Sequence, residues 1–73
     1  MEDPYLSDAM SLTKLVAVCG VGSCPTVYKT DRGTLLVQGF TVDGSDVGVD
    51  LPVGETLVEI PVALLEQAAR IVP

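Results

Sequence analysis

The segment TVYKTDRGTLLVQGFTV, residues 26–42, constrains the fold of this chain more than any other stretch. Its first five residues are of types that favour β-strands, and a turn sequence follows them. Asp31 and Arg32 suit a type I turn, and Gly33 suits the left-handed position of a bulged hairpin turn. The segment therefore predicts a β-hairpin whose returning strand covers residues 34–42.

Pairing across this turn sets Val27 opposite Val37 and Tyr28 opposite Leu36. Apolar side chains then occupy both faces of the hairpin, with Val27, Leu35 and Val37 on one face and Tyr28, Leu36, Phe40 and Val42 on the other. A sheet that is apolar on both faces needs cover on both. Because one terminal helix cannot easily supply that cover, we expect a second chain to contribute to it.

The rest of the chain predicts the remaining elements of a small α+β domain. Apolar and polar residues alternate near 47–51, as in a short strand, and residues 56–60 are typical of a last strand. Pro61 suits the first turn of a helix over residues 61–71. That helix carries an apolar stripe at helical spacing, formed by Leu64, Leu65, Ala68, Ala69 and Val72. We expect one small antiparallel sheet with this C-terminal helix.

The N-terminal part is harder to interpret. Residues 1–8 are polar and predict a flexible tail. Four residues that follow lie at helical spacing and favour a short helix: Leu12, Leu15, Val16 and Cys19. Residues 15–18 could also form a strand, which is the alternative. The longest apolar run is too short to span a membrane and the N-terminus is acidic, so we expect a cytoplasmic protein.

Size and charge limit the function classes open to this chain. At 73 residues it forms one domain with a marginal core, although 48% of its residues are hydrophobic. Ten acidic and four basic residues give a net charge of −6, which argues against direct binding of nucleic acid. The chain has no histidine, so Ser-His and Cys-His catalytic pairs are excluded. We therefore expect a protein that is not an enzyme.

The surplus of apolar residues predicts a homodimer. The residues expected at its interface are Leu36, Phe40, Val42, Leu64, Leu65 and Ala68.

The two cysteines, Cys19 and Cys24, allow three interpretations. Structural zinc needs four ligands, so only a dimer that shares both cysteines of each chain could complete a site. A disulfide is sterically possible, but the cytoplasm opposes it. We favour two free thiols beside a glycine turn and expect no cofactor. A dimeric zinc-binding or thiol redox-sensing module is the alternative function.

Two motifs resemble a known group of proteins. The stretches CPTVYKTDRGTLLVQG and LPVGETLVEIPVALLEQAA are similar to small companion proteins of actinomycetes (Streptomyces-type), of the BldB kind, whose genes lie beside helix-turn-helix regulators of the WhiJ kind. The resemblance covers most of residues 19–70. It implies a role in transcription and developmental regulation, exerted through contact with such a regulator.

The hairpin tip supplies candidate residues for that contact. Loop ends on a rigid scaffold often carry binding residues. Lys29, Asp31 and Arg32 are therefore the predicted partner-binding residues.

Overall fold

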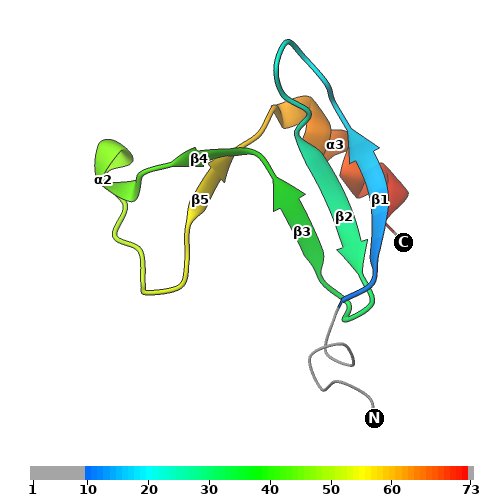
Figure 1. Ribbon diagram of the computed structural model, residues 1–73, viewed down its shortest axis with the longest axis horizontal. Coiled ribbons are helices and arrows are strands. Elements are labelled where there is room, and N and C mark those ends of the chain that lie inside the picture. The colour runs from blue at the N-terminus through cyan, green and yellow to red at the C-terminus, as the bar shows by residue number, and fades with distance from the viewer. Residues whose placement is uncertain (1–9, 73) are drawn as a thin grey trace.

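The computed structural model describes residues 10–72, and the tail predicted over residues 1–8 lies outside them. The chain forms two regions, which Figure 1 shows side by side. We call residues 10–39 and 60–72 the body and residues 40–59 the arm. The body contains β1 (Leu12–Ala17), β2 (Thr26–Thr30), β3 (Leu35–Gln38) and α3 (Val62–Ile71). The arm contains β4 (Phe40–Val42), α2 (Gly44–Val47) and β5 (Leu57–Glu59).

The α+β class is confirmed, but the strands form two sheets where one was expected. Three antiparallel strands in the order β1-β2-β3 make the body sheet, and β4 pairs antiparallel with β5 in the arm. The arm extends from the β3 side of the body (Figure 1). The last strand, expected over 56–60, is present as β5.

The hairpin of β2 and β3 has the predicted register. Val27 pairs with Val37, and Tyr28 pairs with Leu36. The tip is also as expected, because Gly33 has a φ of 77° and lies in the left-handed region that a bulged turn requires. This agreement follows from local chemistry, since the turn and both strands are encoded within one short segment.

The short N-terminal helix that we favoured is wrong, because this part of the chain forms β1. The register of β1 against β2 shifts between Lys14 and Val16, which marks a β-bulge. A bulge places two residues of one strand opposite one residue of the other. Leu15 and Val16 both pack against the buried core as a result. Two consecutive inward residues break the alternation of a strand and produce the spacing that resembled a helix.

The returning strand expected over 34–42 is interrupted at Gly39. A Cβ atom at this position would lie 2.5 Å from the carbonyl oxygen of Glu59, so only glycine allows the two segments to approach so closely. The chain then leaves the body, and Phe40 pairs with Glu59 in the arm. The expectation that Phe40 and Val42 share a sheet face with Leu36 is therefore wrong.

The strand expected near 47–51 is also absent from the described residues, and α2 forms just before it. The Asp43 carboxylate accepts hydrogen bonds from the backbone N–H of Ser45 at 3.0 Å and from its hydroxyl at 2.9 Å. A side chain that satisfies an N-terminal N–H group in this way stabilises the start of a helix. Asp43 therefore closes the segment into one helical turn, which ends where Gly48 donates its N–H to the Gly44 carbonyl.

The predicted C-terminal helix is confirmed as α3, which follows Pro61 and packs across β1 and β2. The buried hydrophobic side chains of the described residues are Val27, Leu64 and Ala68. Four partly buried side chains, Leu15, Val16, Val18 and Ile60, pack against these three. The whole of this core lies in the body.

Candidate functional site

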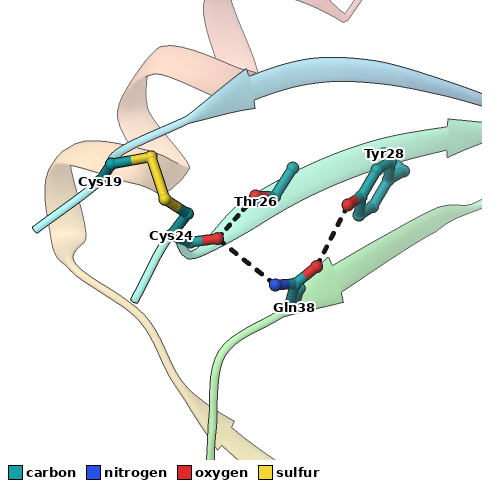
Figure 2. The surroundings of a disulfide bond; sticks show 5 residues. All are labelled: Cys19, Cys24, Thr26, Tyr28 and Gln38. Carbon is teal, nitrogen blue, oxygen red and sulfur yellow. Dashed lines mark hydrogen bonds between the residues drawn. A yellow bond between two sulfur atoms is a disulfide. The ribbon is translucent and has the colours of Figure 1, made fainter. Parts of the chain in front are cut away.

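A disulfide joins Cys19 to Cys24 (Figure 2), so the interpretation as two free thiols is wrong. The disulfide forms because the antiparallel hydrogen bonding of β1 and β2 continues beyond the ends of the two strands. The Val18 N–H donates to the Pro25 carbonyl at 3.0 Å, and the Gly20 N–H donates to the Ser23 carbonyl at 2.8 Å.

Cys19 and Cys24 face each other between these two hydrogen bonds, with their Cα atoms 4.0 Å apart. Residues at such a non-hydrogen-bonded position of an antiparallel pair are the closest neighbours across a hairpin. The sequence holds a signal for this arrangement, because the two cysteines are symmetrically placed about Val21 and Gly22.

A hydrogen-bond network ties the disulfide loop to the end of β3 (Figure 2). The Cys24 carbonyl accepts from the Thr26 hydroxyl at 2.7 Å and from the Gln38 amide nitrogen at 3.5 Å. The Tyr28 hydroxyl donates to the Gln38 amide oxygen at 3.1 Å. Gln38, which sequence reasoning did not single out, therefore connects Cys24 to the β2–β3 hairpin.

The alternative of an intersubunit zinc site requires thiolates at Cys19 and Cys24. While the two sulfurs are bonded to each other, neither is a thiolate. Within residues 10–72, no group of three or more cysteine or acidic side chains is placed to hold a metal ion. The oxidised form therefore does not present the ligands that this site needs.

Two hollows with volumes of about 220 and 360 Å³ flank the disulfide loop. Ser23, Pro25 and Phe40 line both of them, so the hollows meet where the loop faces the base of the arm. Among the described residues that line them, Glu59 is the one with an ionisable side chain, since the cysteines are bonded. Phe40 is 59% exposed at this corner, which suits contact with an apolar group.

The hairpin tip presents the three predicted partner-binding residues together. Lys29, Asp31 and Arg32 are all exposed, and they surround Thr30, which is buried. The Thr30 side-chain oxygen lies 2.6 Å from that of Thr34 and accepts the Arg32 backbone N–H at 3.1 Å. This anchor holds the tip in one conformation.

The large apolar residues that the core does not use are exposed on both the body and the arm. Of the predicted interface residues, Leu36, Phe40 and Leu65 are exposed and Val42 is half-buried. Leu64 and Ala68 instead fill the chain's own core, so they are not available to a second chain. The arm also exposes Val47, Val49, Val53 and Val58, and β3 exposes Leu35, Leu36 and Val37.

Charge is divided unequally between the two regions. The arm carries five acidic residues and no basic one, a net charge of −5: Asp43, Asp46, Asp50, Glu55 and Glu59. The described part of the body carries four basic and two acidic residues, a net charge of +2: Lys14, Lys29, Arg32, Arg70, Asp31 and Glu66. Sequence reasoning used only the total charge and so missed this separation.

Comparisons of the chain with protein-family models, with curated proteins and with solved structures found no match. No helix within residues 10–72 has the length and apolar character needed to cross a membrane.

Proposed function

We propose that this chain is a non-enzymatic regulatory protein that acts through protein–protein contact. The observation that carries the proposal is the imbalance between core and surface. Three hydrophobic residues of the described chain are buried, whereas fifteen large ones are exposed. Exposed apolar surface on this scale is typical of interaction sites. Self-association into a homodimer is part of the proposal, and no cofactor is needed for it.

The kind of partner is suggested by charge and by the family resemblance. An acidic arm with exposed valines and Phe40 complements a basic surface with apolar groups, and DNA-binding proteins offer such a surface. The resemblance to actinomycete companion proteins points to a helix-turn-helix regulator, and hence to control of transcription during development. In this proposal the chain contacts the regulator and does not contact the nucleic acid.

Affinity capture from the native host tests the proposal. The bait is the tagged full chain, as wild type and as Phe40→Asp, which places a charge where an apolar contact is expected. Val62→Asp is the matched control, because Val62 is 75% exposed in the first turn of α3, where an acidic residue is tolerated.

We expect a DNA-binding regulator to be retained by the wild type and by Val62→Asp, and to be lost with Phe40→Asp. The purified regulator must then bind the purified chain. Equal retention by all three baits, or no specific retention, would contradict the proposed function.

A thiol redox sensor is the second candidate, and the disulfide favours it. The Cys19–Cys24 bond closes the loop that lines both hollows. The proposal retains the cytoplasm as the location, where disulfides are mostly transient and functional. In that compartment this cysteine pair would cycle between its oxidised and reduced forms.

Trapping thiols in intact host cells with an alkylating reagent tests this candidate. A population that shifts from reduced to oxidised under oxidant, with a parallel change in partner capture, supports a sensor. A pair that stays fully oxidised marks the disulfide as structural. Metal analysis of the reduced protein distinguishes a zinc-binding module from a thiol sensor. A zinc-binding module requires about half an equivalent of zinc per chain, and Cys24→Ser should remove that zinc.

A further inference from the structure

β3 is an edge strand without the usual protection. It lies at one side of the sheet, and its sequence LLVQ contains no charge and no proline. Soluble proteins commonly protect such edges with lysine, proline, a bulge or a covering element. The three apolar side chains of β3 are each between 39% and 43% exposed. An apolar edge of this kind is suited to pairing with another strand.

The register of the hairpin shows which backbone groups β3 offers. The Thr30 N–H donates to the Thr34 carbonyl at 2.9 Å, which marks Thr30 and Thr34 as a hydrogen-bonded pair. Hydrogen-bonded and non-hydrogen-bonded pairs alternate along an antiparallel ladder. Leu36 therefore directs its N–H and carbonyl toward β2, whereas Leu35 and Val37 direct theirs toward the open edge.

We propose that β3 pairs antiparallel with the β3 strand of a second copy, with Leu36 beside the partner's Leu36 on the two-fold axis. This inference deepens the self-association in the proposed function and rests on it. In this register Leu35 lies opposite the partner's Val37, and the outward groups of both residues are satisfied. The two body sheets join into one continuous six-stranded sheet.

The topology carries the arm toward the partner's basic residues. The arm leaves the chain at the C-terminal end of β3, and the hairpin tip precedes the N-terminal end of the same strand. Antiparallel pairing places opposite ends of the two strands side by side. The arm of one copy therefore begins beside the partner's hairpin tip, where Lys29 and Arg32 are exposed.

Charge complementarity makes a second copy the occupant of this edge. The arm has a net charge of −5 and the described body one of +2, and the proposed pairing brings arm and body together twice. A two-fold interface needs one surface that is complementary to itself. The β3 edge meets this requirement, because its aliphatic residues pair with the same residues of the partner.

Crosslinking of Leu36→Cys tests the pairing directly. Facing residues of a non-hydrogen-bonded pair lie within the Cα separation that a disulfide needs. With diamide as the oxidant, two Leu36→Cys chains at micromolar concentration should form a covalent dimer. Val53→Cys is the control, because Val53 is 105% exposed and lies in the arm, outside the strand that the proposed pairing joins.

We expect Leu36→Cys to crosslink at least about tenfold faster than Val53→Cys, although Leu36 is only 39% exposed. Adding Val37→Pro should abolish this advantage, since it removes an outward N–H without removing a β2–β3 hydrogen bond. Equal rates for the two cysteines, or a rate that Val37→Pro leaves unchanged, would overturn the proposed pairing.

Removing acidic charges from the arm tests whether the arm lies beside the partner's basic body, which we call the crossing of the arm. The variant Asp46→Asn/Asp50→Asn/Glu55→Gln should raise the dimer dissociation constant in sedimentation equilibrium at low salt, because arm-to-body attraction is lost. Glu66→Gln, which removes an acidic charge from the body, should not raise it. Tighter association of the triple variant would overturn the crossing, since relief of net repulsion would then dominate.

These outcomes are separable from the fate of the proposed function. A monomer in sedimentation overturns both the β3 pairing and the proposed self-association, while capture of a regulator by the monomer would still support protein–protein contact as the function. A dimer without preferential crosslinking retains self-association and rejects this interface.

Discussion

The body and the arm are built from similar residues and reach different states. Valine and leucine are frequent in both regions, yet the buried hydrophobic side chains of the described residues all lie in the body. The arm is ordered by local bonds, namely the β4–β5 ladder, the Asp43 cap and a turn in which the Glu55 N–H donates to the Pro52 carbonyl at 3.1 Å. Apolar content therefore does not locate a core, because a core also needs a facing element such as α3.

The difference implies unequal stability. Regions with few buried apolar contacts open at a lower free energy than the core elements of the same chain. We expect backbone amides of the arm to exchange their hydrogens faster than those of the body. Contact with a partner should slow exchange in the arm and remove that difference.

The largest effect is expected from Leu64→Ala, which breaks the body. Leu64 is 0% exposed between α3 and the sheet, so truncation leaves a cavity and should cost about 3 kcal/mol of unfolding free energy. A domain of this size has little more than that in reserve. Leu65→Ala, one residue along the helix and 59% exposed, is the control for urea unfolding. An equal loss from Leu65→Ala would contradict the assigned core face.

A smaller effect is expected where the two regions join. In Gly39→Ala the new Cβ would meet the Glu59 carbonyl oxygen at 2.5 Å and the Ile60 side chain at 2.7 Å. Relief of this overlap requires a backbone shift that should cost about 2 kcal/mol. Gly20→Ala, whose Cβ would meet no atom within 4 Å, should be almost neutral in the same denaturation experiment. If the two substitutions cost the same, the close approach at Gly39 is not a constraint.

The hairpin tip of the body should respond less strongly. Gly33 has a φ of 77°, which a β-branched residue resists, so Gly33→Val should cost at least about 1 kcal/mol. Gly33→Asn is the control, because asparagine tolerates the left-handed region better. Unchanged denaturation midpoints for both variants would remove the bulged-turn assignment.

The smallest effect concerns the arm alone and depends on pH. Hydrogen bonds from the Ser45 backbone N–H and then from the Ser45 hydroxyl lower the pKa of Asp43 below its ordinary value. The cap therefore contributes fully above the ordinary aspartate pKa of about 3.9 and is lost as pH falls through the lowered value.

Amide exchange and the chemical shift of Ser45 should report this loss below about pH 4. Asp43→Asn keeps the acceptor oxygen without the titration, so its Ser45 signal should stay constant over the same range. A Ser45 midpoint at or above the ordinary aspartate value would contradict the cap.

Short-range features of the fold were predictable from the sequence, and features that depend on a distant neighbour were not. The turn at Gly33 and the helix after Pro61 carry their signals within a few residues. The bulge after Lys14 and the break at Gly39 depend on contacts with β2 and with Glu59, which lie far along the chain.

The candidate site shows the same division. The exposed tip at Lys29 and Arg32 followed from turn chemistry alone. We favoured free thiols over a disulfide because we expected a cytoplasmic protein. The symmetric placement of Cys19 and Cys24 about a turn was nevertheless visible in the sequence. Only the pairing of β1 with β2 shows that this placement brings the two cysteines opposite each other.

The close approach of Gly39 to Glu59 means that the chain departs from the body and rejoins it at neighbouring points. Residues 40–59 are thus a topological insertion in a β-β-β-α unit that contains its own core. An insertion whose two ends lie close together can change in length or sequence without altering the pairing of β1, β2 and β3 or the position of α3 against them. Substitution of its acidic residues or exposed valines should therefore change what the arm contacts and leave the core of the β-β-β-α unit intact.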